Sequence, residues 1–577
     1  MRKLGFLTFV LCCTAQAQTV NVTVDVTSQA HPFSPLIFGV AFGDPARNAQ
    51  IGYTVDRWGG NSTTRYNWQA EFYNTASDYY YENIPNCNSA FCPPGLGKAD
   101  LFISAAFAGG AQPLMTIPTI GWTPRADSPI THPYFAGFKV SNYGIQTTGP
   151  YGQPAVDPFD TDAGGGYCDA SANHTGYCVN GLIVNNDPTD TSTAVTSTFA
   201  SAWISHLQTT FAGNGGVKYF ALDNEVMLWD STHRDVHPNP PTYDEIWSRT
   251  LDYATAIKAQ EPAAIITGPV TWGYSDLFTS AKDAADCNCS DGSDRQAHSD
   301  LPFVAWYLQQ VCANPLAGGK RLVDYLDLHY YPQDPYPASG SIYSNDADAA
   351  TVGRRLRSLK ELYDPAWRSE SWIGGLDGPG GDDPQHYPFP DLIPRVRAWI
   401  DTYCPGTKLA ITEYAWDKDQ TVSGAVAQAE ALAIFAREGV DMATRWVAPD
   451  ANSMAERAFQ IFLNYDGAGS SVQGDSVAAS SANVDQIGAY AFRLPGQRTM
   501  LLLTNKDTAA SHGIAITFNA ALSGVWTLYG FDGTHALHQI STGSVSSNTV
   551  TLSPLPSLSA NLLVLPDVDV IFKNGFN

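Results

Sequence analysis

The chain has 577 residues, 44% of them hydrophobic, which is enough for a large core and at least two domains. Its formal net charge of −24, with only 15% charged residues, argues against nucleic acid or an anionic membrane surface as a partner. The 12% of aromatic residues, 14 of them Trp, suits a neutral ligand with flat faces on which rings can stack.

The first 17 residues, MRKLGFLTFVLCCTAQA, predict an export signal. Two basic residues precede a short apolar run, and the small-residue pattern Ala15-Gln16-Ala17 predicts cleavage after Ala17. The run is too short to span a bilayer, and no later stretch reaches the required length of about 20 residues. We therefore expect a soluble protein that is secreted to the extracellular space or to the periplasm. A lipid anchor at Cys12 or Cys13 is the alternative, which the large residues before them disfavour.

The cysteines favour an oxidising compartment. Two of the ten fall in the predicted signal, and the remaining eight are an even number suited to disulfides. Two close pairs lie in loops rich in Gly, Asn and Pro and predict short-range bridges: Cys87 with Cys92, and Cys168 with Cys178. Cys287 and Cys289 are too close to pair with each other without strain. A zinc site on this Cys-Asn-Cys is less favoured than disulfides, because no second thiol or His pair stands at metal spacing.

Short apolar runs between residues 36 and 446 predict buried parallel strands. The eight candidates are 36–42, 53–60, 113–120, 217–224, 263–270, 322–331, 408–414 and 439–446. Amphipathic helical stretches separate most of them, at 197–213, 242–260, 301–313, 391–403 and 425–438. No helix is evident between the first two strands. Strands that alternate with helices eight times predict an α/β fold, a TIM-like (β/α)₈ barrel over residues 36–465.

After about residue 465 the helical periodicity ends. Short alternating strands follow between Gly, Asn and Ser turns, at 499–504, 513–518, 524–530 and within 549–565. They predict a smaller all-β sandwich over 466–577. The strictly alternating segment Val20–Val26 precedes the barrel, and we expect residues 18–35 to belong to the same sandwich.

Two glutamates stand where predicted strands end. Strand four runs apolar to Leu222 and continues as Asp223-Asn224-Glu225, and strand seven ends at Glu413. The carboxyl ends of barrel strands form the catalytic face of this fold. Hydrolysis of a glycosidic bond with retention needs one protonated acid and one ionised nucleophile about 5–5.5 Å apart, which these strands can supply. Either glutamate alone could equally be a surface charge; the pair favours catalysis.

Four further residues could support this pair. Asn224 is placed to bind a sugar 2-hydroxyl, a contact that strengthens in the transition state. His329 and Tyr331, at the end of strand six, could hydrogen-bond the nucleophile and hold it ionised. Arg57, at the end of strand two, could do so by its fixed positive charge; a structural ion pair is an equally good interpretation.

Longer motifs around these residues resemble glycoside hydrolase family 44. They are 57–68 (RWGGNSTTRYNW), 183–192 (IVNNDPTDTS), 221–238 (ALDNEVMLWDSTHRDVHP) and 409–416 (LAITEYAW). The resemblance implies an endo-β-1,4-glucanase or xyloglucanase with a (β/α)₈ barrel, a β-sandwich and catalytic glutamates on strands four and seven. It gives Glu225 the role of acid/base and Glu413 that of nucleophile. Insertions at 86–92 and 284–296 are places where this chain departs from relatives.

Several tryptophans lie at or just past predicted strand ends, where a glucan could stack on them. These subsite candidates are Trp58, Trp122, Trp229, Trp272 and Trp416. Packing in the core or in loops is the alternative and is expected to account for two or three of them.

The resemblance also implies a bound calcium ion. Calcium takes six to eight oxygen ligands, which acidic loops can supply. The loop 157–169 is the most ligand-like, with Asp160 and Asp162, and Glu71 and Asp100 are further candidates. Such an ion would be structural, since the chemistry needs no cofactor.

The sequence thus predicts a secreted, monomeric, retaining endo-glycosidase that cleaves β-1,4-glucans such as cellulose-type glucan and xyloglucan. A barrel glycosidase acting mainly on xylan or mannan is one alternative, because these polymers share the β-1,4 backbone. A carbohydrate-binding surface protein without catalytic activity is the other. Neither a nucleic acid nor a membrane is an expected partner.

Overall fold

The computed structural model describes residues 18–28, 31–87, 92–93, 95–169, 171, 176–287, 292–335, 341–346, 348–375, 388–416, 419–494, 496 and 498–566. The predicted signal peptide lies outside them, as do Cys289 and the side chain of Cys287. The chain divides into two compact units, one formed by Pro32–Ser471 and the other by the described residues up to His31 together with those from Val472 onward. Residues 32–35 and 466–471, which we assigned to the sandwich, belong to the first unit.

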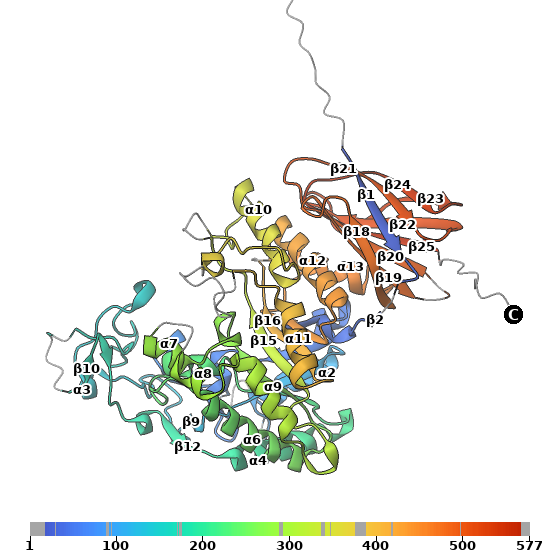
Figure 1. Ribbon diagram of the computed structural model, residues 1–577. Coiled ribbons are helices and arrows are strands. Elements are labelled where there is room, and N and C mark those ends of the chain that lie inside the picture. Colours follow the sequence, from blue (N-terminus) through green and yellow to red (C-terminus); the bar gives the residue numbers. More distant parts are fainter. Residues whose placement is uncertain are drawn as a thin grey trace, which may run out of the picture. The chain divides into compact units, whose positions relative to one another are not determined.

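Eight parallel strands close into a barrel in the first unit (Figure 1). In chain order they are β3 (Gly39–Ala41), β4 (Val55–Trp58), β8 (Gln112–Ile117), β13 (Tyr219–Leu222), β14 (Ile265–Thr271), β15 (Tyr325–Tyr330), β16 (Lys408–Tyr414) and β17 (Met442–Arg445). Each falls within or overlaps one predicted run, so the predicted barrel is confirmed. The strands read as apolar runs because almost every residue in them is buried: all four of β4 and six of the seven in β16.

The helices of this unit lie around the barrel and in the loops that extend from it. They are α1 (Pro45–Ile51), α2 (Lys98–Ala108), α3 (Val140–Tyr143), α4 (Ser197–Thr210), α5 (Trp229–Thr232), α6 (Tyr243–Gln260), α7 (Ala281–Cys287), α8 (Ser293–Ala297), α9 (Phe303–Ala313), α10 (Ala349–Arg357), α11 (Leu392–Tyr403), α12 (Val422–Glu438) and α13 (Met454–Leu463). The five predicted helices are α4, α6, α9, α11 and α12. No described helix combines the length and the apolar character needed to cross a membrane.

A helix, α1, lies between the first two strands, where the sequence made none evident. Its signals are those of a short helix. Asp44 caps its N-terminus by accepting a hydrogen bond from the Arg47 N–H, and Pro45 occupies the first turn. Gly52 ends it with a φ of 92°, a conformation that glycine adopts at little cost.

The barrel interior is apolar toward the start of the strands and polar toward their ends. Val55, Leu114, Ala221 and Ala410 belong to one buried cluster. Farther along β15, the Asp327 carboxylate accepts hydrogen bonds from neighbouring strands, among them one of 2.7 Å from the Thr412 hydroxyl. The catalytic face is thus built on a packed floor, as in other barrels of this type.

Loops with short strands extend the barrel unit. Their strands are β5 (Tyr66–Asn67), β6 (Phe72–Asn74) and β7 (Asn83–Pro85) in one sheet, and the pairs β9 (Trp122–Pro124) with β12 (Ser192–Ala194) and β10 (Cys178–Val179) with β11 (Leu182–Ile183). The predicted disulfides Cys87–Cys92 and Cys168–Cys178 are confirmed here. A third, Cys312–Cys404, joins α9 to the end of α11 and was not foreseen.

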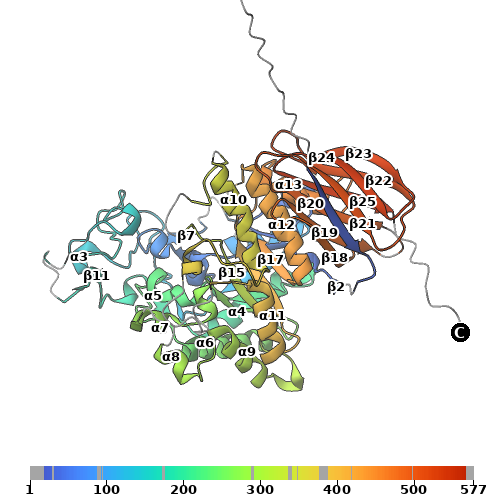
Figure 2. The same cartoon turned by 45° about the horizontal axis from the view of Figure 1, so that its top comes forward.

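The second unit is the predicted β-sandwich, and β1 (Thr19–Asp25) is part of it (Figure 2). Its other strands are β18 (Asp475–Ser481), β19 (Ile487–Leu494), β20 (Arg498–Asn505), β21 (His512–Phe518), β22 (Gly524–Phe531), β23 (His538–Val545), β24 (Thr549–Leu555) and β25 (Ser559–Pro566). β1 runs parallel to β21 and antiparallel to β18. Its alternation follows from burial, because Val20, Val22 and Val24 enter the sandwich core while the residues between them are exposed.

Candidate active site

Five polar side chains converge at the carboxyl ends of the barrel strands. Arg57 lies on β4, Asn224 and Glu225 follow β13, His329 lies on β15 and Glu413 on β16. Arg57, Asn224 and His329 are almost fully buried, whereas the Glu225 and Glu413 side chains keep 16% and 10% of their surface exposed. The two carboxylates are therefore the parts of this cluster that a ligand can reach.

His329 lies between the two glutamates. Its Nδ1 is 3.0 Å from Glu225 Oε1 and 3.7 Å from Glu413 Oε2. One oxygen of each carboxylate and one ring nitrogen lie within 4.8 Å of one another. This separation agrees with the roughly 5–5.5 Å of retaining glycosidases and leaves no room for the extra water that inverting enzymes place between their carboxylates.

Arg57 connects three members of the cluster. Its Nη1 donates to Glu413 Oε2 at 2.7 Å, and its Nη2 donates to Asn224 Oδ1 at 2.7 Å. The same Nη2 lies 3.3 Å from His329 Nε2. Because a guanidinium can only donate, Nε2 is the accepting nitrogen and Nδ1 carries the proton that points to Glu225.

Tyr331 completes the surroundings of Glu413. Its hydroxyl donates to Glu413 Oε1 at 2.7 Å, so each oxygen of this carboxylate has a donor. Burial and the neighbouring Glu413 charge raise the pKa of Tyr331, which keeps the hydroxyl protonated and able to donate. A carboxylate with two fixed donors, one of them cationic, is held ionised and in a single orientation.

Glu225 has the opposite environment. Burial raises its pKa to about 7, an effect that the Arg57 charge opposes and the Asp78 charge enhances. Burial also lowers the pKa of His329 to about 4, so this imidazole is neutral at ordinary pH. One carboxyl of the pair can therefore carry a proton near neutrality while the other is ionised, which is the division of charge that acid-assisted attack on an acetal carbon requires.

The backbone around Glu225 is held in an uncommon conformation. Asp223 and Glu225 have φ values of 69° and 49°, in the left-handed region that non-glycine residues seldom adopt. The buried Asp223 carboxylate fixes this turn, because it accepts from the backbone N–H of Thr119 at 2.5 Å and of Ile120 at 3.1 Å, and from that of Asn224 at 2.8 Å. The turn points Glu225 toward His329.

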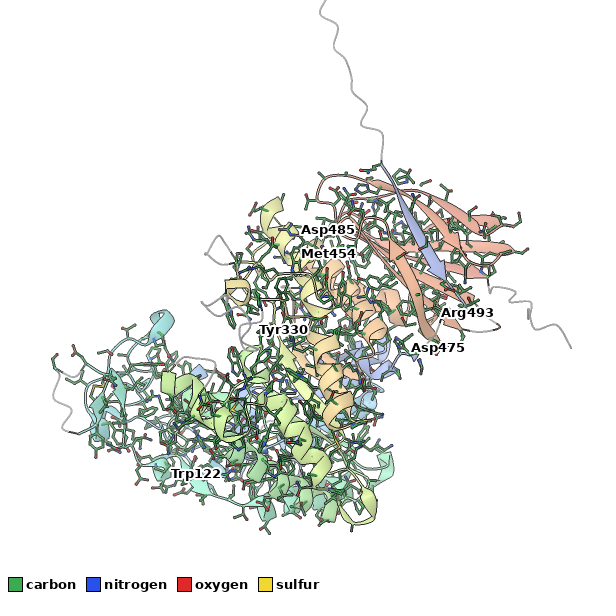
Figure 3. The ribbon with its side chains drawn as sticks, in the orientation of Figure 1. Trp122, Tyr330, Met454, Asp475, Asp485 and Arg493 are labelled. Carbon is green, nitrogen blue, oxygen red and sulfur yellow. A yellow bond between two sulfur atoms is a disulfide. The ribbon has the colours of Figure 1, made fainter. Side chains whose placement is uncertain are left out.

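The predicted tryptophan subsites are only partly accessible. Trp58, Trp229 and Trp416 are buried, with 7%, 0% and 1% of their surface exposed, so they pack within the protein rather than at a surface. Trp122 and Trp272 are half-buried. Trp122 lies on β9, apart from Tyr330 at the end of β15 (Figure 3).

Two aromatic residues at the barrel mouth escaped the sequence analysis. Trp446 follows β17, and its ring lies 5.9 Å from the Arg57 guanidinium carbon. Phe42 follows β3, contacts Trp446 at 5.7 Å and is 41% exposed. Their position directly after the first and last barrel strands was the available signal.

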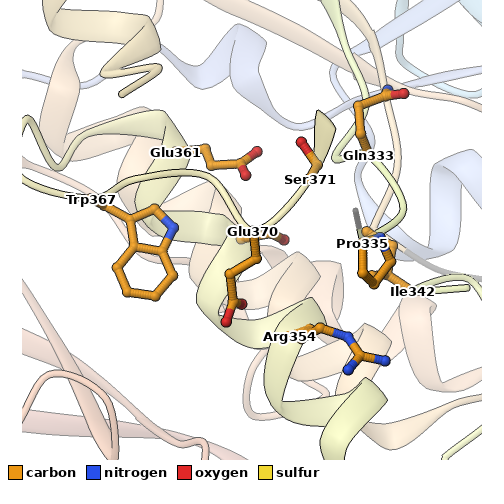
Figure 4. Close-up of a pocket in the computed structure, with 9 residues that line it drawn as sticks. Gln333, Pro335, Ile342, Arg354, Glu361, Trp367, Glu370 and Ser371 are labelled. Carbon is orange, nitrogen blue, oxygen red and sulfur yellow. The ribbon is translucent and has the colours of Figure 1, made fainter. Parts of the chain in front are cut away.

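A small pocket beyond β15 does not hold the chemistry (Figure 4). Gln333, Glu361, Trp367 and Glu370 are among its lining side chains, and its volume of about 10 Å³ suits a single water rather than a sugar. It has one link to the cluster, since Gln333 Nε2 donates to the Tyr331 carbonyl at 2.9 Å.

None of the predicted calcium ligands belongs to a group of three or more metal-type side chains among the described residues. Glu71 accepts from the Tyr66 hydroxyl and the Lys98 N–H, and Asp100 accepts from the Gly97 N–H and pairs with His206, so protein donors at the start of α2 occupy both. In the other loop, Asp162 accepts from the backbone N–H and the hydroxyl of Ser141, and Asp160 accepts from the N–H of Asp162.

A group of metal-type side chains lies beside that loop. Ligand atoms of Glu82, His132 and Asp157 lie within 4.8 Å of one another. Glu82 and Asp157 are fully buried, yet both Glu82 oxygens and Asp157 Oδ2 have no hydrogen-bond partner. Burial and the Asp157 charge raise the pKa of Glu82 to about 8, because an unpartnered buried charge is costly; a bound cation would favour the ionised form of both carboxylates. The two carboxylates suit calcium, which takes oxygen ligands, whereas the exposed His132 imidazole is a ligand that zinc accepts.

Comparison with known proteins gives consistent results. The sequence profile described as glycoside hydrolase family 44 matches residues 72–334. The crystal structure of CelM2, a bifunctional glucanase-xylanase from a metagenome library, is 34% identical, with a TM-score of 0.84 over 96% of this chain and 100% of that chain. A Paenibacillus polymyxa xyloglucanase of family 44, 23% identical, has the same fold, with a TM-score of 0.73 over 96% and 100% of the two chains.

Two longer relatives extend these matches. Endoglucanase A of Paenibacillus lautus is 28% identical over 97% of this chain and 76% of its own length. The β-mannanase/endoglucanase A of Caldicellulosiruptor saccharolyticus is 29% identical over 89% of this chain, and the match spans only 36% of that relative.

Proposed function

The chain belongs to glycoside hydrolase family 44, and on that premise we propose that it is a retaining, endo-acting hydrolase of β-1,4-glucan chains, xyloglucan and cellulose-type glucan among them. The observation that carries the proposal is the pair Glu225 and Glu413, within 4.8 Å of each other and in opposite electrostatic environments. The printed names of the relatives support the substrate class.

In the first step Glu225 gives its proton to the glycosidic oxygen while Glu413 attacks the anomeric carbon and forms a covalent glycosyl-enzyme. The bond to the leaving oxygen breaks, and its electron pair takes the proton. Arg57 and Tyr331 hold Glu413 as an oriented carboxylate before the attack. In the second step Glu225, now ionised, removes a proton from water, which attacks the same carbon and releases Glu413.

Asn224 and His329 assist without exchanging protons with the substrate. Asn224 Oδ1 accepts from Arg57 and from the Gly60 N–H, and Nδ2 donates to Asn61. The second hydrogen of Nδ2 remains for the sugar 2-hydroxyl. His329, neutral and 3.0 Å from Glu225, steadies this carboxyl in both of its protonation states.

A panel of polysaccharides tests the substrate. We expect reducing ends from xyloglucan, carboxymethylcellulose and lichenan, with viscosity falling early because internal bonds are cut. The double variant Glu225→Gln/Glu413→Gln is the control for contaminating enzymes. Hydrolysis of xylan or mannan without hydrolysis of any glucan would replace the proposed substrate class; the CelM2 and Caldicellulosiruptor names make these polymers the second candidates. Binding without any reducing ends would contradict the catalytic proposal.

We also propose that the protein is secreted as a monomer. The predicted signal peptide supports export, and the three disulfides support an oxidising compartment, outside the cell or in the periplasm.

The Glu82–Asp157 site is proposed to hold a structural calcium. Adding millimolar Ca²⁺ to metal-stripped protein should raise the melting temperature by about 2–5 °C, because an ion that binds only the folded state stabilises it. Glu82→Gln and Asp157→Asn should each abolish the rise. Glu71→Gln is the matched control, because its carboxylate oxygens already have protein donors and the rise should persist. A rise with Zn²⁺ alone, lost in His132→Ala, would assign the site to zinc instead.

A further inference from the structure

Asp78 is presented to the barrel mouth by a tightly held segment. It ends the 3-10 helix Ala76–Asp78 between β6 and β7. Three nearby non-glycine residues have positive φ values: Ala76 at 52°, Tyr80 at 53° and Tyr81 at 56°. All three are buried, whereas Asp78 is exposed. Such backbone strain persists only where the surroundings impose it, so the Asp78 side chain has a fixed origin.

Asn61 binds Asp78 through its amide nitrogen. Asn61 Nδ2 donates to Asp78 Oδ1 at 3.1 Å and to Oδ2 at 3.3 Å. An ionised carboxylate can only accept, so Asp78 determines which end of the Asn61 amide faces it. The other end, Oδ1, accepts from Asn224 Nδ2 at 3.3 Å.

The orientation of Asn61 matches that of Asn224, which two obligate donors, Arg57 Nη2 and the Gly60 N–H, also require. With Asn61 Oδ1 facing it, Asn224 directs Nδ2 toward Asn61 and Oδ1 toward Arg57 Nη2 and the Gly60 N–H. Arg57 in turn donates to Glu413. A chain of donors and acceptors thus runs from the exposed Asp78 to the nucleophile, and at each contact a donor faces an acceptor.

Asp78 also contributes charge to the active site. It lies within electrostatic range of both catalytic glutamates, and its negative charge helps to raise the pKa of Glu225. The other ionisable groups facing Glu225 are Arg57 on β4, His329 on β15, Glu413 on β16, and Tyr331 and Asp276 beyond β15 and β14. Burial raises the pKa of Asp276 well above its usual range, so it contributes little charge near neutrality.

We propose that Asp78 is a positioning residue of this active site: it holds the Asn61 oxygen toward Asn224 and so, together with Arg57 and the Gly60 N–H, keeps Asn224 placed to present an N–H to the sugar bound beside Glu413. The inference rests on the proposed function. It explains why a solvent-accessible acid is held on so constrained a segment next to two carboxylates that it repels.

Asp78→Asn provides the test. The new amide can turn an N–H toward Asn61, so Asn61 is no longer held with its oxygen toward Asn224. We expect kcat on xyloglucan to fall about tenfold with little change in KM, because the 2-hydroxyl contact strengthens in the transition state. Loss of the charge should move the basic limb of the kcat/KM profile to lower pH by roughly half a unit. Asp401→Asn, an exposed acid on α11, should change neither.

Two further variants separate orientation from charge. Asn61→Ala leaves the strained segment intact and should lower kcat without moving the basic limb. The double exchange N61D/D78N restores an acceptor for Asn224 and should recover most of the lost kcat. An unchanged kcat in Asp78→Asn would overturn the inference. So would a double variant whose loss of kcat is simply the sum of the losses caused by the two single exchanges. Neither result would affect the proposed function, which fails instead if the Glu225→Gln and Glu413→Gln variants stay active.

Discussion

Replacing Glu413 by glutamine is expected to lower kcat on xyloglucan by about 10⁴-fold or more, as removal of an enzyme nucleophile does. The amide cannot form the glycosyl-enzyme, whereas its oxygen can still accept from Arg57, so the fold should persist. Reducing-end release measures the loss, and a melting curve close to that of the wild type shows that the loss is catalytic. Glu261→Gln, at the end of α6, is the matched control and should keep full activity.

The same assignment determines the stereochemistry of the product. Two displacements at one carbon retain its configuration, so proton NMR of fresh product should show the β anomer first. Initial release of the α anomer would rule out a covalent role for Glu413. Wild-type turnover in Glu413→Gln would rule out any catalytic role.

Replacing Glu225 by glutamine should lower kcat on glucan by about 10³-fold, the usual contribution of a general acid. On an aryl glycoside whose leaving group needs no proton, the variant should form the glycosyl-enzyme almost as fast as the wild type does. Added azide should then accelerate turnover, because a small anionic nucleophile does not need a general base to attack the glycosyl-enzyme. The acid role would be contradicted if glycosyl-enzyme formation slowed equally for substrates with good and with poor leaving groups.

The pH profile tests the same residue in the unmodified enzyme. Since burial raises the pKa of Glu225 to about 7 and its protonated form is the acid, kcat/KM should decline above about pH 7. A rate that stays constant well beyond that pH would mean that another group supplies the proton.

Much of the fold could be predicted because buried parallel strands have a clear sequence pattern. All eight barrel strands read as apolar runs, and the end of a run locates the catalytic face to within a residue or two, which is how Glu225 and Glu413 were selected. The helix α1 was missed because its seven residues are too few for periodicity, leaving only the cap at Asp44 as a signal.

The direction in which a side chain points was harder to predict. Trp58 and Trp416 stand at strand ends like the glutamates, but their rings turn into the protein.

The candidate metal site was missed for a different reason. Glu82 and Asp157 are 75 residues apart, on segments without a spacing motif, and only the folded loops bury the two carboxylates together with both Glu82 oxygens and Asp157 Oδ2 lacking a donor.

The position of β1 has a consequence for biosynthesis. This strand leaves the ribosome well before its partner β18, because Thr23 pairs with Ser480, 457 residues later in the chain. Until then the valines of β1 have no partner and their strand edges are open to association with other chains. A strand that is made early thus finds its partner late, and deletion of β18 should leave the valines of β1 exposed in every molecule.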